Sequence, residues 1–161
     1  FFEMLSEYII DGFKVAIFVC VMIIGFIAFL NLADSIFTSV CGISLRAIIG
    51  YILYPIAWLL NINASEIHLA SQIMGTKIVT NEFVAMEMLS QHTKDFSAHT
   101  EAVIAVFLVS FANFSSIGII IGAIQALSKE ASVKVAKFSL KILYGAILVS
   151  FLSASVVGFV I

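Results

Sequence analysis

Three long runs of the sequence contain no charged residue, and each is long enough to cross a lipid bilayer as a helix. They are residues 15–33, 102–128 and 142–161. A helix of about 20 apolar residues covers the hydrocarbon core, and it satisfies its own backbone hydrogen bonds where water is absent. The composition agrees, because 62% of the residues are hydrophobic and only 11% are charged. The sequence therefore predicts an all-α, multi-pass membrane protein with three transmembrane helices in contact with lipid.

Two further segments are predicted to lie at the membrane surface. Residues 1–14 carry three acidic residues and one lysine, and we interpret them as an amphipathic interfacial segment. Residues 44–61 contain Pro55 together with Tyr and Trp side chains, which favour the headgroup level of a bilayer. This pattern favours an interfacial helix for 44–61, with a kinked transmembrane helix as the alternative.

The lysines indicate an orientation. Four of them crowd the short link between the second and third apolar runs, at Lys129, Lys134, Lys137 and Lys141. Cytoplasmic loops carry an excess of Lys and Arg. We therefore expect this link in the cytoplasm and the C-terminus outside the cell, in a protein of the plasma membrane.

Residues 64–91 are predicted to form a re-entrant helical hairpin. The segments 64–75 and 81–91 suit helices, and residues 75–80 would join them. Each helix would be roughly 18 Å long at about 1.5 Å per residue, which is well short of a bilayer core of about 30 Å. The two helices would therefore enter the membrane and turn back within it.

This hairpin contains two ionisable residues, Lys77 and Glu82. Charged side chains at membrane depth are costly, so they are candidates for function. Asn81 is well placed to cap the second helix, and Glu82 would lie in its first turn, where the helix dipole favours a carboxylate. Glu82 could then face a cavity and accept hydrogen bonds from hydroxyl groups. The alternative is a structural ion pair between Lys77 and Glu82.

The run 102–128 is interrupted near its middle by polar residues. Ser and Asn compete for backbone hydrogen bonds, which favours a discontinuous helix; the alternative is hydrogen bonding between packed helices. A hairpin beside a broken helix is typical of one inverted repeat of a transporter, whose substrate site lies near the bilayer midplane. The polar residues are Ser110, Asn113, Ser115 and Ser116.

Other functions have less support in the sequence. No nucleophile or metal-ligand constellation suggests an enzyme, the histidines and two cysteines match no ligand spacing, and the net charge of −2 gives no nucleic-acid signal. We therefore predict no enzymatic activity, no metal site and no nucleic-acid partner. A non-transporting structural subunit of a membrane complex is the alternative function. Because the chain begins with Phe1, we expect it to be the C-terminal part of a longer protein.

Two motifs resemble signatures of the concentrative nucleoside transporters. The first is Gly75-x-Lys77-x-x-x-Asn81-Glu82-Phe83-Val84-Ala85-Met86, and the second is Phe111-Ala112-Asn113-Phe114-Ser115-Ser116. Their order and the pattern of apolar runs agree with the C-terminal part of such a transporter, which contains the second inverted repeat.

The resemblance implies a trimeric symporter that moves nucleosides inward on a sodium or proton gradient, with no other cofactor. Residues 15–33 would belong to the scaffold around the trimer axis. The coupling-ion site would lie mostly in the other repeat, so both sodium and proton stay candidates for the coupling ion. The substrate-binding residues would be Glu82, Asn113 and Ser116 at the ribose and Phe111 near the base, with Asn81, Lys77 and Ser115 supporting them.

Overall fold

The structure is a computed structural model that describes residues 1–161 apart from the side chain of Phe26. All secondary structure in this described part of the chain is helical. The elements are α1 (Phe2–Cys41), α2 (Leu45–Leu59), α3 (Ile67–Val79), α4 (Glu82–Gln91), the short 3-10 helix η1 (Thr93–Asp95), α5 (Ala98–Leu108), α6 (Phe114–Leu127) and α7 (Lys129–Val160).

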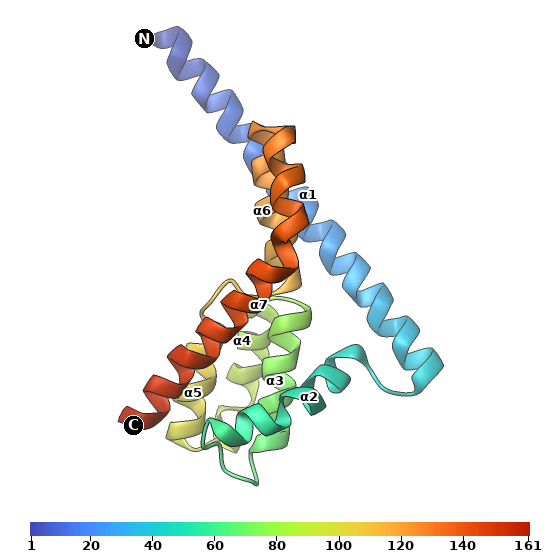
Figure 1. Ribbon diagram of the computed structural model, residues 1–161, viewed down its shortest axis with the longest axis vertical. Helices are drawn as coiled ribbons and strands as arrows, with labels where there is room; N and C mark the ends of the chain where they lie inside the picture. Colours follow the sequence, from blue (N-terminus) through green and yellow to red (C-terminus); the bar gives the residue numbers. More distant parts are fainter.

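Among the described residues, two helices are long and apolar enough to cross a membrane, α1 with 40 residues and α7 with 32. Figure 1 shows α1 as a long arm that crosses α6, while α3, α4 and α5 gather beside the C-terminal half of α7. We expected a surface segment at 1–14 before a span at 15–33, but α1 is continuous through both, and no proline interrupts it. Likewise α7 begins well before residue 142, with Ser128 as its N-cap.

The expected discontinuous helix at 102–128 consists of α5 and α6, separated by residues 109–113. Asn113 begins α6, because its side-chain oxygen accepts a hydrogen bond from the backbone N–H of Ser116. This cap gives the second half-helix its own start, which is the typical role of Asn in front of a helix.

Helices α3 and α4 form a hairpin whose turn consists of Thr80 and Asn81 alone. Our expectation of a loop at 75–80 was wrong, because α3 continues through Gly75 to its end at Val79. Gly75 serves packing instead. A Cβ atom there would lie only 2.8 Å from the backbone nitrogen of Gly50 on α2. The glycine thus lets α2 and α3 approach closely without breaking either helix.

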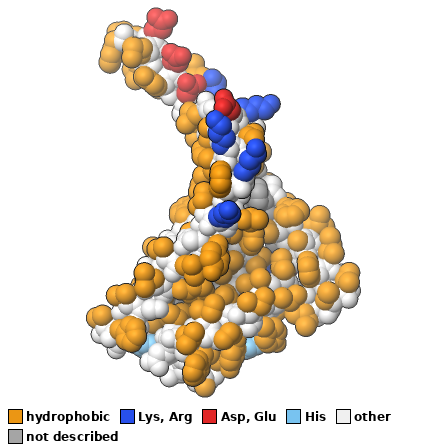
Figure 2. Space-filling model, viewed as in Figure 1, with side chains coloured by type: hydrophobic (Ala, Val, Ile, Leu, Met, Phe, Trp, Pro, Cys, Tyr) orange, Lys and Arg blue, Asp and Glu red, His pale blue; other side chains and the backbone are white. Residues whose placement is uncertain are grey.

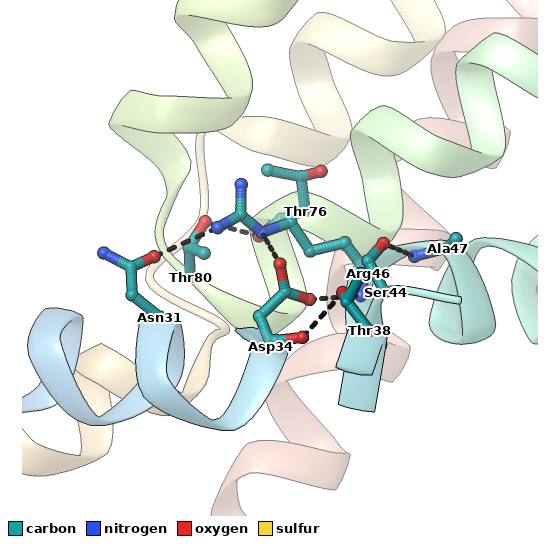
Figure 3. A network of polar contacts seen from close by, with 8 residues as sticks. All are labelled: Asn31, Asp34, Thr38, Ser44, Arg46, Ala47, Thr76 and Thr80. Carbon is teal, nitrogen blue, oxygen red and sulfur yellow. Dashed lines mark hydrogen bonds and ion pairs between the residues drawn. The ribbon is translucent and has the colours of Figure 1, made fainter. Parts of the chain in front are cut away.

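A polar network ties the end of α1 to the start of α2, beside the tip of the hairpin (Figure 3). The Arg46 guanidinium donates from Nη2 to Asn31 Oδ1 at 3.0 Å, and its Nε lies 3.4 Å from Asp34 Oδ2. Thr76 and Thr80 of the hairpin lie next to this network. The connection between α1 and α2 is therefore fixed where it passes the hairpin.

The core lies where α2, the hairpin, α5 and α7 meet. Phe107 on α5 is fully buried, and its ring stacks on Phe151 of α7 at a centroid distance of 4.9 Å. Outside this core the surface is largely apolar, as Figure 2 shows, with charged side chains gathered where α1 and α7 begin. Such an extensive apolar exterior requires a cover of lipid or protein.

Candidate functional site

The tip of the hairpin meets the break between α5 and α6 through one pair of buried side chains. Glu82 is the first residue of α4, and Asn113 is the N-cap of α6. The Asn113 amide nitrogen Nδ2 donates a hydrogen bond to Glu82 Oε2 at 2.6 Å. Two polar residues that are 31 positions apart in the chain thus form the centre of a site.

The other half of the Asn113 amide is held by α6. Asn113 Oδ1 accepts hydrogen bonds from the backbone nitrogen of Ser116 at 2.7 Å and from Ser116 Oγ at 2.9 Å. On the hairpin, Asn81 Oδ1 accepts from the backbone nitrogen of Val84 at 3.0 Å and caps α4. Two helices therefore begin at the site, and their N-terminal ends carry partial positive charge that favours the Glu82 carboxylate.

A cavity of about 160 Å³ opens beside the Glu82–Asn113 contact. Residues from the hairpin tip, the break, α6 and α1 line it: Val19, Ile23, Asn81, Glu82, Phe83, Phe111, Asn113, Ser115, Ser116 and Ile119. The cavity brings together six of the seven residues that the sequence singled out. The additional lining residues are apolar, and nothing in the composition of α1 distinguishes Val19 and Ile23 from their neighbours.

The polar groups of this cavity are only partly engaged. In the part of the chain that the structure describes, no hydrogen bond reaches the second carboxylate oxygen of Glu82, and Ser115 Oγ is buried without a partner. The Phe111 side chain, by contrast, is largely exposed beside the cavity. The site therefore combines an available carboxylate oxygen and a fixed amide with an aromatic surface.

Lys77 is the one predicted site residue that lies elsewhere. Its Nζ donates hydrogen bonds to Ser110 Oγ at 3.0 Å and Ser150 Oγ at 3.4 Å, and it lies 4.4 Å from the centroid of the Phe107 ring. Among the described residues, no ion pair within 4.0 Å joins Lys77 to Glu82. The structure therefore does not contain the structural ion pair that was the alternative role for Glu82.

A larger cavity, of about 380 Å³, lies between the ends of α2 and α7. Its lining residues are Leu59, Leu60, Asn61, Ser155, Gly158 and Phe159. None of them is charged, so this cavity offers no group comparable with Glu82. The smaller cavity at the hairpin tip is the stronger candidate because its polar side chains are buried and converge.

The chemistry available at the hairpin tip is recognition by hydrogen bonds. A carboxylate accepts from hydroxyl groups, and charge-assisted hydrogen bonds of this kind are among the strongest in proteins. An amide and a serine hydroxyl beside it can donate to and accept from the same ligand. A ligand with adjacent hydroxyl groups fits this set of partners.

Comparison with known proteins agrees with this chemistry. The family described as "Na+ dependent nucleoside transporter C-terminus" matches residues 1–158. The purine nucleoside transport protein NupG of Bacillus subtilis is 37% identical over 160 residues, which cover 98% of this chain and 40% of NupG. Sodium/nucleoside cotransporter 1 of Oryctolagus cuniculus is 29% identical over 156 residues, covering 86% of this chain and 24% of the cotransporter.

Solved structures show the same relationship. A variant of the transporter CNTnw in an outward-facing state superimposes with a TM-score of 0.87 at 27% identity, over 96% of this chain and 41% of CNTnw. The resemblance found in the two motifs is thereby confirmed, and these similar proteins are transporters rather than enzymes. The chain spans 40% of the length of NupG, so it corresponds to a part of each relative.

Proposed function

Because the chain belongs to the family of Na⁺-dependent nucleoside transporters, as the C-terminal part of its members, we propose that it forms the sugar-binding half of a cation-coupled nucleoside symporter. The observation that carries this proposal is the hydrogen bond between Glu82 and Asn113 at the edge of a cavity. NupG and the rabbit cotransporter are named for nucleosides, and a nucleoside presents the hydroxyl pattern that these two side chains suit.

In this proposal Glu82 accepts hydrogen bonds from the vicinal hydroxyls of ribose through its unengaged oxygen. Asn113 and Ser116 complete the hydrogen-bond partners of the sugar, and Phe111 lies against the base. Asn81 and Ser115 support this arrangement from the two capped helix starts. A ligand without the hydroxyls would leave the second oxygen of a buried carboxylate without a hydrogen bond, and such a site discriminates strongly against it.

The size of the cavity is consistent with a shared site. Pockets for whole small-molecule ligands are typically about 300–1,000 Å³, whereas this cavity is about 160 Å³. We propose that this chain encloses the sugar and that the other inverted repeat of the transporter encloses the remainder of the nucleoside. The coupling ion, sodium or proton, would bind mostly to that other repeat.

The arrangement in the membrane follows from the same proposal. The hairpin of α3 and α4 would be re-entrant, with its tip and the break between α5 and α6 near the midplane, and α2 would lie at the interface. Transport would proceed by alternating access in a homotrimer of the plasma membrane, with the C-terminus outside. The alternative of a non-transporting subunit has no counterpart among the transporters to which this chain is similar.

Uptake of radiolabelled uridine into proteoliposomes tests the proposal. The full-length protein that contains this chain should accumulate uridine when a sodium or proton gradient is imposed, and Glu82→Gln should abolish uptake. Glu87→Gln is the matched control, because Glu87 lies on the same helix with its side chain exposed and should transport normally. Uptake by Glu82→Gln at the rate of the control would contradict the role of this carboxylate.

A further inference from the structure

The side chain of Lys77 is completely buried, with an exposed fraction of 0%. It extends from α3 toward the seam between α5 and α7, two helices that pack against one another. Transferring an ammonium group from water to an apolar interior is very costly unless polar partners compensate for the lost hydration. A lysine in this place therefore needs partners that hold it there.

The partners come from three different elements. Ser110 belongs to the break after α5, Ser150 to α7, and Phe107 to α5 itself. Ser110 and Ser150 also hydrogen-bond to each other through their hydroxyls. In the described part of the chain no carboxylate lies within 4.0 Å of Nζ. The ammonium is thus held by oxygens and an aromatic face rather than by a counter-ion.

The position of the ammonium at the end of α5 supplies the electrostatic compensation. Helix α5 ends at Leu108, two residues before Ser110. The C-terminal end of a helix carries partial negative charge, and the face of an aromatic ring attracts a cation. In transporters with broken helices, such half-helix ends can coordinate a metal cation. This chain places its own ammonium group at a half-helix end.

We propose that Lys77 is a positioning residue whose ammonium group acts as a tethered cation, holding the hairpin against the broken helix and α7. The reason is that two separate contacts join the hairpin to the break between α5 and α6. Lys77 and Glu82 both lie on the hairpin, whereas Ser110 and Asn113 both lie in the break. The Lys77–Ser110 and Glu82–Asn113 contacts therefore join the same two segments at two points.

The functional consequence concerns the geometry of the site. If the Lys77 contact is lost, the Glu82–Asn113 hydrogen bond is the one side-chain hydrogen bond among the described residues that still joins the hairpin tip to the break. The position of the unengaged Glu82 oxygen, to which the ligand binds in the proposed function, then depends on that hydrogen bond alone. With Lys77 in place, the hairpin keeps its position while the unengaged oxygen of Glu82 binds the ligand. This role rests on the proposed function, because nucleoside binding is what the positioned residues perform.

The test compares Lys77→Met, Ser150→Ala and their double mutant in the reconstituted full-length protein. Hydrogen bonds to charged groups affect affinity by about ten-fold or more, so Lys77→Met should raise the KM for uridine by at least about ten-fold in the protein that remains folded. Ser150→Ala should raise the KM in the same direction by less. Because both act through one contact, the double mutant should resemble Lys77→Met alone.

Lys94→Met is the matched control, because Lys94 is exposed in η1 and its loss should leave the KM unchanged. A purely structural role of Lys77 predicts a lower maximal rate at unchanged KM, and that result would overturn the proposal. Additive effects of Lys77→Met and Ser150→Ala would overturn it as well. If Lys77→Met does not fold, Ser110→Ala takes its place in the same cycle with Ser150→Ala.

Hydrogen exchange measured by mass spectrometry gives a readout without nucleoside. Amides of residues 75–91 should exchange faster in Lys77→Met than in Lys94→Met, while those of α1 should be unchanged, because local contacts set local opening. Equal exchange in both variants would overturn the positioning role. Failure of the wild-type protein to transport nucleosides would instead refute the proposed function, and the exchange measurement would still decide the role of Lys77.

Discussion

Asn113 Nδ2 lies 2.6 Å from Glu82 Oε2, although one residue caps α6 and the other begins α4. Two helix N-termini thus converge on one carboxylate, next to a cavity that no other described carboxylate lines. The contact places the only buried acidic side chain in the described part of the chain where a ligand can reach it.

Replacing Asn113 should separate its two roles. Asn113→Ala removes both the cap of α6 and the donor to Glu82, whereas Asn113→Ser retains a capping oxygen but loses the amide. We expect both variants to bind ribonucleosides about ten-fold or more weakly, because a hydrogen bond to a charged group is lost.

Only Asn113→Ala should also lose about 1 kcal/mol of stability, the typical value of an N-cap. Binding assays and thermal melts of the purified protein measure the two effects. Wild-type affinity in Asn113→Ser would remove the amide from the site.

The close approach of α2 and α3 should make Gly75 intolerant of a side chain. In Gly75→Ala the new Cβ would lie 2.8 Å from the Gly50 nitrogen and 3.0 Å from the Arg46 carbonyl oxygen. Because both atoms belong to backbone, the helices must move apart, and overpacking of this kind costs about 1–3 kcal/mol. Gly145→Ala is the control, since nothing lies within 4 Å of its Cβ position. A melting temperature lowered only in Gly75→Ala supports this account, and equal melting temperatures would refute it.

Glu66 should make the stability of the open end of the hairpin depend on pH. Partial burial of the Glu66 carboxyl raises its pKa, but hydrogen bonds from Thr100, Ser97 and Asn63 outweigh that effect, so the pKa lies below its ordinary value of 4.5. A carboxyl whose pKa is lowered by folding stabilises the protein fully above the unfolded pKa, and this contribution disappears as the pH falls through the folded pKa. Wild type should therefore melt at a higher temperature than Glu66→Gln at pH 7. This difference in melting temperature should shrink below about pH 4.5.

The partner variant for this pH experiment is Ser97→Ala. Ser97 donates to Glu66 Oε1 from its backbone nitrogen and to Oε2 from its hydroxyl, each at 3.0 Å. Removal of the Ser97 hydroxyl should reproduce part of the decrease in melting temperature that Glu66→Gln shows at neutral pH. If the difference in melting temperature between wild type and Glu66→Gln grows as the pH falls, the lowered pKa of Glu66 is contradicted.

The lysines at the start of α7 should determine the orientation of the chain. With Cys20 and Cys41 replaced by serine, a single cysteine at the C-terminus should react with a membrane-impermeant maleimide added outside the cell. The change of Lys129, Lys134 and Lys137 to glutamine should reduce that labelling, because positive loops remain in the cytoplasm. Lys94→Gln is the control and should label as wild type. Unchanged labelling in the triple variant would show that other charges set the orientation.

Much of the site could be predicted from sequence because its residues combine two separate signals. Asn81 and Asn113 each precede an apolar helical segment, which marks a helix start, and Glu82 is a carboxylate in an apolar context. These local signals identified where α4 begins, that the run 102–128 is broken near its middle, and which side chains could converge, whereas the role of Asn113 as the N-cap of α6 emerged from the structure. They could not establish the Glu82–Asn113 contact itself, since that depends on how the hairpin packs against α5 and α6.

Other features depend on tertiary packing and were missed or misassigned. Gly75 suggested a turn, but its lack of a side chain serves the contact with Gly50, so α3 continues to Val79. Lys77 was expected to support the substrate site, with an ion pair to Glu82 as the alternative, but its long side chain reaches the seam between α5 and α7 instead. Val19 and Ile23 line the cavity only because α1 crosses α6. No local pattern distinguishes such residues from others that face lipid.

The most direct test of the account is the affinity of wild type and Glu82→Gln for uridine and for 2′,3′-dideoxyuridine. If Glu82 binds the ribose hydroxyls, wild type should prefer uridine by about ten-fold or more, because charge-assisted hydrogen bonds are lost with the dideoxy ligand. Glu82→Gln should bind both ligands weakly and with nearly equal affinity. If Glu82→Gln keeps the wild-type preference for uridine, the hydroxyls are recognised elsewhere and the central claim is contradicted.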